Sequence, residues 1–514
     1  MMSAFLNGVE SMSRYLSFLL SFPVLSLAPI TPALAQVTAA ELWNEWQTQG
    51  AAQGQTLVAE EAIETDTGLI LNGVSTTMAG ADTMAGLAQV DTITLTNNRD
   101  GTVNIEMSQP YTIDIAFPAD AFEDGSPPVT IEILMTYEGL EIVAGGTVGE
   151  RTYDYTADTL TLTDGEITGG SEPLNVNFSL VMNGLDATDV VDGRNLENIV
   201  TESVYALENL IIAFDAAPED RSQGNLKFNL SMDDIAFEGG GNIGSFASYA
   251  EFDVFPENFD VSGVFEYAGL TYDVDLNDDT SSFQMAYTNA GGAMEVDVST
   301  DEIAYGLTAN GTEVHIEGSD IPMPIDVTSE SAEFSFAFPI AASEDLADAT
   351  LRIAYEDITM GDPIWALFDP GEFMARDPIT LVADVSAQLQ VLVDLMTYDP
   401  AETDGDPIEL RGLRINEILL AALGAELTGT GDFEFMQNPI FPQPVGVIDL
   451  RASGVMALLD RLQDSGILPS ENVLMVRGLI GGFTRPGSAP DTLETNIEFT
   501  EDGQVTANGL ELPF

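Results

Sequence analysis

Residues 379–396 read ITLVADVSAQLQVLVDLM, and every second residue from Ile379 to Leu395 is apolar. Most residues between them are polar, among them Asp384 and Asp394. Because successive side chains of a β-strand point to opposite faces, this period of two predicts a strand with one buried face. At roughly 3.3 Å per residue the strand would be about 55 Å long, against a usual length of about 17–20 Å.

The same alternation occurs in other parts of the chain, and turn signals separate many of the runs. Further runs are Val129 to Tyr137, Leu226 to Met232 and Phe334 to Ile340. The turn signals are Arg99-Asp100-Gly101, Thr163-Asp164-Gly165, Asn289-Ala290-Gly291-Gly292, Asn310-Gly311 and Asp502-Gly503. Because such turns join antiparallel strands, the predicted fold class is mainly β: an elongated, kinked antiparallel sheet with a few short helices, two of them near the C-terminus.

A short element recurs inside these runs: usually a polar residue, then Gly or Asp, then an aliphatic residue. It is found at Asn72-Gly73-Val74, Glu138-Gly139-Leu140, Asn183-Gly184-Leu185, Asp233-Asp234-Ile235, Ala268-Gly269-Leu270, Glu356-Asp357-Ile358, Arg411-Gly412-Leu413 and Asn508-Gly509-Leu510. Glycine, and less often aspartate, accepts a positive φ, and one such residue inside a strand shifts the alternation and bends the strand as a bulge does. Eight ordinary hairpin turns are the alternative interpretation, and local chemistry does not separate the two.

Helix signals are few. Thr38 and Glu41 form a capping box that predicts a helix ending at Gly50. Short helices are also predicted after Asp362-Pro363, at Asn416 to Leu423, from Ser453 to Gly466 and from Ser470 to before Pro486. Each has a single apolar stripe, which is typical of a helix that packs on a sheet face.

The N-terminus carries the pattern of an export signal. Arg14 precedes an apolar run from Tyr15 to Ala28, and Ala33-Leu34-Ala35 offers the small residues that signal peptidase reads. We therefore expect residues 1–35 to be a cleavable signal peptide, with Met12 as an alternative start. The expected location is the periplasm, and the outer membrane and the exterior are the less favoured alternatives. The remaining region, 36–514, is expected to be β-rich, with a subdivision near 360 into 36–360 and 361–514. No later run resembles an integral helical anchor.

The charge of the chain is extreme: 85 Asp and Glu oppose 14 Lys and Arg, for a net charge of −71. This charge argues against nucleic acid and against an anionic membrane surface as partners. It also makes the folded chain repel itself at low ionic strength, which predicts adaptation to a saline medium.

Few residues are available for catalysis, because the chain has no cysteine and one histidine, His315. A Ser-His-Asp or Cys-His site needs a histidine in place, and the usual zinc sites need several His or Cys ligands. His315 lies between Val314 and Ile316 and is predicted to face solvent beside Glu313 and Glu317. Residues 239–244 read GGGNIG, which we interpret as a flexible turn because no βαβ unit surrounds it. We therefore expect no enzymatic activity and no cofactor.

Acidic residues suggest a weak calcium site in one loop. The candidate ligands are Asp399, Glu402, Asp404, Asp406 and Glu409. Residues 273–279 resemble the start of a calcium loop, but Asp278 and Gln284 depart from the required Gly and Glu, so we predict a strand there.

Three blocks in the C-terminal third resemble a known family. They are Trp365 to Pro370 with Arg376-Asp377-Pro378, Leu423 to Gly431, and Phe483 to Gly487 with Asp502-Gly503 and Asn508-Gly509. Together they resemble the bacterial exported-protein family called domain of unknown function 2125. The resemblance implies an exported, β-rich protein, and no catalytic residues come with it.

The function these patterns favour is a non-catalytic periplasmic scaffold or binder that presents an apolar groove to lipid or another envelope component. The groove candidates are Trp365, Phe368, Leu381, Val385, Leu389 and Val393. An ordinary buried core is the simpler interpretation of the same strand face. The alternative functions are an acidic calcium-dependent surface protein, a hydrolase that uses carboxylates alone, and an outer-membrane β-barrel closed by the strand ending at Phe514, in which Pro513 would be awkward.

Overall fold

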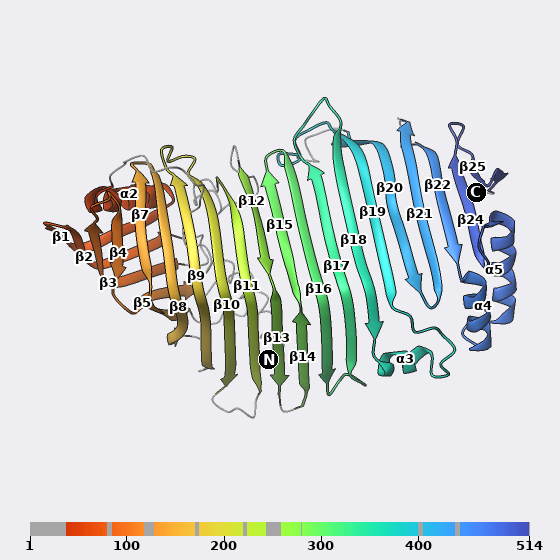
Figure 1. Ribbon diagram of the computed structural model, residues 1–514, viewed down its shortest axis with the longest axis horizontal. Coiled ribbons are helices and arrows are strands. Elements are labelled where there is room, and N and C mark those ends of the chain that lie inside the picture. Colours follow the sequence, from red (N-terminus) through yellow and green to blue (C-terminus); the bar gives the residue numbers. More distant parts are fainter. Residues whose placement is uncertain are drawn as a thin grey trace. The chain divides into compact units, whose positions relative to one another are not determined.

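The computed structural model describes residues 37–79, 85–117, 128–169, 174–218, 224–242, 259–278, 280–398, 405–436 and 443–512. The predicted fold class is confirmed: the chain is mainly β, with one large antiparallel sheet and a few short helices, two of them near the C-terminus (Figure 1). The predicted signal peptide and Phe514 lie outside the described residues.

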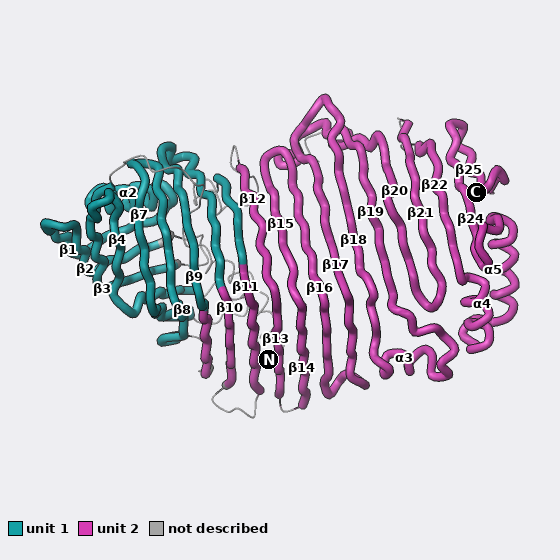
Figure 2. Tube along the Cα trace, in the orientation of Figure 1, with its two compact units in different colours: residues 1–169, 182–207, 236–250 teal, residues 170–181, 208–235, 251–514 magenta. Residues whose placement is uncertain are grey.

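The chain divides into two compact units (Figure 2). Unit 1 comprises residues 1–169, 182–207 and 236–250, and unit 2 comprises residues 170–181, 208–235 and 251–514. Residue 360, near which the sequence suggested a subdivision, is the last residue of β18 (Ala347–Met360). This strand pairs with β19 (Ile379–Val391), and both lie inside unit 2. Strands β9 (Leu174–Asp192), β10 (Val200–Pro218) and β11 (Asn225–Asn242) contribute residues to both units.

Among its described residues, unit 1 packs one helix against antiparallel strands. Helix α2 (Ala39–Ala52) begins with the predicted capping box of Thr38 and Glu41. The strands are β1 (Gln55–Thr65), β2 (Gly68–Ala79), β3 (Ala85–Asn97), β4 (Val103–Met107), β5 (Tyr111–Phe117), β6 (Val129–Glu138), β7 (Glu141–Thr147) and β8 (Glu150–Gly169). β3 pairs with both β4 and β5, and β8 pairs with both β6 and β7, so the short strands lie in succession along a long neighbour.

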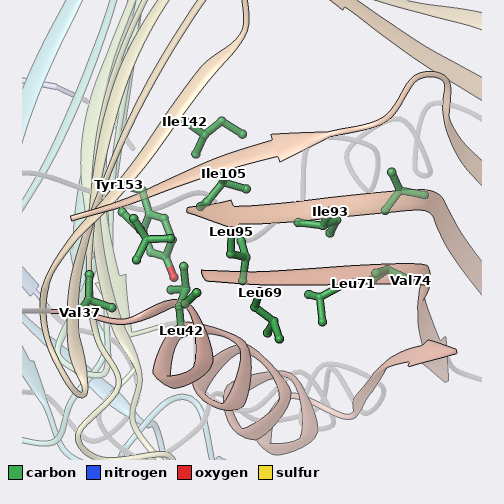
Figure 3. Close-up of a cluster of buried hydrophobic side chains, with 14 of the residues drawn as sticks. Val37, Leu42, Leu69, Leu71, Val74, Ile93, Leu95, Ile105, Ile142 and Tyr153 are labelled. Atoms are coloured by element: carbon green, nitrogen blue, oxygen red, sulfur yellow. The ribbon is translucent and has the colours of Figure 1, made fainter. Parts of the chain in front are cut away.

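The core of unit 1 lies between α2 and the apolar side of these strands (Figure 3). Leu42 of α2 is fully buried, as are Leu71 of β2 and Val103 of β4. Trp46 Nε1 donates a hydrogen bond of 2.8 Å to the Tyr153 hydroxyl of β8. The helix is therefore held to the sheet by apolar packing together with a polar contact.

Unit 2 is a row of paired strands (Figure 1). The strands are β12 (Asp260–Tyr267), β13 (Gly269–Asn277), β14 (Ser282–Asn289), β15 (Gly291–Ser299), β16 (Glu302–Gly318), β17 (Ile325–Pro339), β18, β19, β20 (Ile408–Ala422), β21 (Ala425–Met436), β22 (Gln443–Ser453), β23 (Arg485–Pro486), β24 (Thr492–Phe499), β25 (Val505–Ala507) and β26 (Leu510–Glu511). β12 pairs with β15, β13 with β14, and both β14 and β15 with β16. From β16 to β22 each strand pairs with the next, and β22 pairs with β24.

The recurring Gly or Asp element is mostly a kink inside a strand path. Left-handed φ values occur at Gly73, Gly139, Gly184, Asp234 and Asp357, whereas Gly269 and Gly412 lack one and Asn508-Gly509 forms the β25–β26 turn. In unit 2 the kinks fall at neighbouring positions of adjacent strands. Ala290 N donates to Asn310 O beside Gly311, and Ser329 Oγ donates to Glu356 O beside Asp357.

Each kink shifts the alternation by one residue, as expected of a bulge. In β16 the apolar residues are odd-numbered before Gly311 (Ile303, Tyr305, Leu307) and even-numbered after it (Val314, Ile316). In β18 they are odd-numbered before Asp357 (Leu351, Ile353, Tyr355) and even-numbered after it (Ile358, Met360). The kinks therefore keep apolar residues on one side along the whole strand.

Several sequence predictions of local structure are wrong. Three of the predicted hairpin turns do not form hairpins. Residues 163–165 lie inside β8, and Asn310-Gly311 lies inside β16. Residues 289–292 join β14 to β15, and these two strands follow one another along the same partner strand, β16. The turns at 99–101 and 502–503 are confirmed. Residues 416–423 form no helix, because β20 extends to Ala422 with a bulge at Asn416 between paired neighbours. The strand predicted over 379–396 ends at Val391, five residues before its predicted end.

Three short helices lie in the described part of unit 2. Helix α3 (Asp362–Phe368) follows β18, as predicted. Helix α4 (Val455–Asp464) starts after Gly454 rather than Ser453, and Asp491 accepts hydrogen bonds from its first backbone N–H groups. Helix α5 (Ser470–Phe483) starts at Ser470 itself, after Pro469. Within the described ranges, no helix has the length and apolar character needed to cross a membrane.

Candidate functional site

One face of the unit 2 sheet carries no charge. Cross-strand partners lie on the same face, so a row of paired residues traces it from strand to strand. The row is Phe265, Met294, Leu307, Phe334, Ile353, Ala383, Ile418, Gly429, Leu450 and Thr495. We call this row, with the residues that share its side of β12, β15 to β22 and β24, the apolar face. None of the ladder-paired positions on this face is Asp, Glu, Lys or Arg, in a chain with 85 acids.

The opposite face of the same strands is charged. Arg352 of β18 lies 2.8 Å from Glu333 of β17, 3.1 Å from Asp384 of β19 and 3.6 Å from Glu417 of β20. Arg414 pairs with Asp432 at 2.8 Å on the next strands. Arg352 and Arg414 are therefore engaged by acids on the face away from the apolar one.

Large side chains of the apolar face are open to solvent. Six of them are between 37% and 43% exposed: Met294, Leu307, Leu351, Tyr355, Leu381 and Leu420. Next to them Tyr305, Phe334 and Phe336 form an aromatic cluster with ring centroids 5.9–6.5 Å apart. A contiguous apolar patch that stays this exposed is typical of a surface that binds another molecule.

The six predicted groove residues do not all lie on this surface. Leu381 and Val385 belong to the apolar face. Leu389 shares that face but is only 6% exposed, near a point where Ser343 N donates to Val391 O. Val393 lies beyond the end of β19.

The two aromatic candidates lie in α3. Trp365 is 4% exposed, and the Arg376 guanidinium lies 5.6 Å from its ring centroid. Phe368 packs against Trp365 with ring centroids 5.0 Å apart and is 43% exposed. Trp365 thus offers almost no surface to a ligand.

The calcium candidates are only partly described. Asp399, Glu402 and Asp404 lie outside the described residues. Asp406 is exposed, and Glu409 forms an ion pair with Arg411. In the part of the chain that the structure covers, no three His, Cys, Asp or Glu side chains gather as a metal site would require.

His315 and most described residues of the other two sequence motifs lie in strands. The His315 side chain is exposed, and its Nδ1 lies 2.7 Å from Asp326 Oδ1, a hydrogen bond that raises the pKa of the imidazole. Residues 239–242 belong to β11 rather than to a turn, and Ile243 and Gly244 lie outside the described residues. Residues 273–277 lie in β13, as predicted, and hydrogen bonds from Thr280 and Ser281 lower the pKa of Asp278 to about 2.

Sequence reasoning missed a buried polar cluster in unit 1. Arg151 of β8 is fully buried, and its guanidinium lies 2.6 Å from Glu45 of α2. Asp189 of β9 is also fully buried and accepts a 3.0 Å hydrogen bond from the Tyr205 hydroxyl. The spacing in the sequence could have indicated this cluster. Glu45 follows Leu42 by three residues, so both lie on the same face of α2, and Arg151 is two residues from Tyr153, so both lie on the same face of β8. The ion pair joins the helix to the sheet, which is a structural role.

Comparison with known proteins identifies no relative: no family, no curated protein and no solved structure matches this chain. The resemblance to the domain of unknown function 2125 therefore stays a prediction.

Proposed function

We propose that this protein is a non-catalytic lipid binder of the bacterial envelope, and that the apolar face of unit 2 holds acyl chains. The observation that carries the proposal is the absence of any charged residue from that face while the other face of the same strands is charged. Acyl chains make no hydrogen bonds, so a surface without polar partners suits them.

The size of the apolar face fits this ligand class. Ten strands spaced about 4.8 Å apart give a face roughly 43 Å wide. One leaflet of a bilayer is about 15 Å thick in its hydrocarbon part, so more than one acyl chain fits end to end. Covering the exposed part of one leucine contributes about 1 kcal/mol, and the six most exposed side chains together supply several kcal/mol toward binding.

The location belongs to the proposal as well. The predicted signal peptide would direct the chain to the periplasm, where lipids pass between the two membranes. Fractionation of cells that express the full precursor tests this part: the processed chain should appear with periplasmic markers. Recovery of an uncleaved chain in the cytosol would contradict it.

Lipid binding is tested by titrating the purified full chain with a soluble short-chain phosphatidylcholine, followed by native mass spectrometry. Leu351→Glu places a charge on the apolar face, and we expect it to weaken binding about tenfold or more. Thr350→Glu is the matched control, because Thr350 is the adjacent, exposed residue and points to the charged face. Equal binding by both variants, or no lipid bound by the unaltered chain, would refute the proposal.

A further inference from the structure

The outer side of helix α5 is strongly apolar. Leu474 is 74% exposed, the highest value among the large apolar side chains of the described residues, and Met475 and Leu479 are 60% and 54% exposed. Val473, on the inner side, is 2% exposed. The helix therefore has a buried apolar side and a second apolar side that no described element covers.

Charge is nearly absent from this helix. Its charged residues are Glu471 and Arg477. Glu471 lies in the first turn, where the helix dipole stabilises an acid, and Arg477 forms an ion pair with Asp460 of α4. From Leu474 to Gly482 the outer side is uncharged, in a chain of net charge −71. An uncharged apolar helix side left open to solvent is typical of a binding surface, and apolar helix sides of this kind also occur in the interface of lipid bilayers.

Helix α5 ends at the last strand of the apolar face. Thr495 of β24, the final residue of the row that defines that face, donates a 2.8 Å hydrogen bond to Phe483 O at the helix terminus. Asn508 Nδ2 donates a 2.9 Å hydrogen bond to the same oxygen. Figure 1 shows α4 and α5 beside β24. A bilayer that touches α5 would therefore lie next to the end of the apolar face.

We propose that the outer side of α5 docks on a zwitterionic lipid bilayer and so places the apolar face of unit 2 where lipid can enter or leave it. This inference rests on the proposed lipid-binding function. A zwitterionic surface is specified because a net charge of −71 is repelled by anionic headgroups, and the arginine of the helix is already paired.

The test is flotation of the full chain with phosphatidylcholine vesicles in a density gradient. We expect the unaltered chain to float, and the double variant Leu474→Glu with Leu479→Glu to bind vesicles about a hundredfold more weakly, about tenfold for each leucine. Gln463→Glu is the control, because Gln463 is an exposed residue of α4 and its substitution adds a negative charge outside α5, so this variant should float normally. Leu474→Ser, a milder change, should give an intermediate loss.

A parallel titration with soluble short-chain phosphatidylcholine separates the two proposals. The double variant should keep full binding of the soluble lipid. If the unaltered chain binds soluble lipid but does not float, or if the double variant floats as well as the unaltered chain, the docking inference is overturned and the proposed function stands. If the chain floats through Leu474 and Leu479 but binds no soluble lipid, the bilayer contact stands and the proposed function fails.

Discussion

At the scale of single residues, Glu45 and Arg151 form an almost fully buried ion pair in unit 1. The Arg151 side chain is 0% exposed and that of Glu45 is 9% exposed, so each charge depends on the other for its stabilisation. A buried pair is expensive to form, and removing one partner leaves an uncompensated charge. The pair therefore fixes the position of α2 against β8.

We expect Arg151→Met to destabilise unit 1 by about 3–5 kcal/mol, because the Glu45 carboxylate would remain buried without its partner. Urea unfolding followed by tryptophan fluorescence measures this, since Trp43 and Trp46 lie in α2. Arg194→Met is the control: its pair with Asp192 is exposed, and its loss should cost less than about 1 kcal/mol. Equal effects of the two substitutions would show that the buried pair does not anchor the helix.

Buried tyrosines make stability depend on pH in the alkaline range. Burial raises the pKa of Tyr111 to about 12 and raises that of Tyr153 further. The folded protein keeps these protons at pH values where the unfolded chain, with a tyrosine pKa near 10, releases them. Their contribution is therefore complete below about pH 10 and is lost as pH rises through 12. The urea concentration at the midpoint of unfolding should be lower at about pH 12 than at about pH 9. The same midpoint at both pH values would contradict this.

At the scale of elements, the strands were predictable, whereas the kinks were predicted only as one of two interpretations, the other being hairpin turns. Alternation at 379–391 predicts β19, because one face of that strand is uniformly apolar. A pair such as Asn310-Gly311 is compatible with a hairpin or with a kink inside β16, and the choice depends on strands that are distant in sequence. Residues 416–423 are rich in helix formers, yet pairing with β19 and β21 keeps them extended. The apolar face was foreseen only in part, because the exposure of Leu381 and the burial of Trp365 depend on packing.

The kinks predict that one substitution lowers the stability of unit 2 and that another does not. Gly311 has φ 60°, and a Cβ there would lie 2.8 Å from Ala290 Cβ, so Gly311→Val should destabilise unit 2 by about 2 kcal/mol. Asp357 has φ 50°, a conformation that glycine adopts freely, so Asp357→Gly should be neutral or stabilising. Gly306→Ala, in the same strand without a left-handed φ, is the control. Urea unfolding measures all three, and destabilisation by Asp357→Gly would argue against strain at the kinks.

At the scale of the whole molecule, the net charge of −71 acts against compactness. Salt shortens the Debye length from about 10 Å at 0.1 M to about 3 Å at 1 M, so the repulsion between acids weakens as salt is added. We therefore expect the melting temperature to rise between about 10 mM and 500 mM NaCl. EDTA in both buffers removes any contribution from bound calcium. A melting temperature that does not rise would contradict the prediction of a saline-adapted chain.

The central claim is that the apolar face of unit 2 is a binding surface for acyl chains. The most direct measurement is photocrosslinking of the full chain to a phosphatidylcholine with a photoreactive group at the end of one acyl chain, followed by peptide mass spectrometry. We predict crosslinks to apolar-face residues of β16 to β20, such as Leu307, Leu351 and Leu381. Crosslinks that fall on the charged face of the same strands, or in unit 1, would contradict the account.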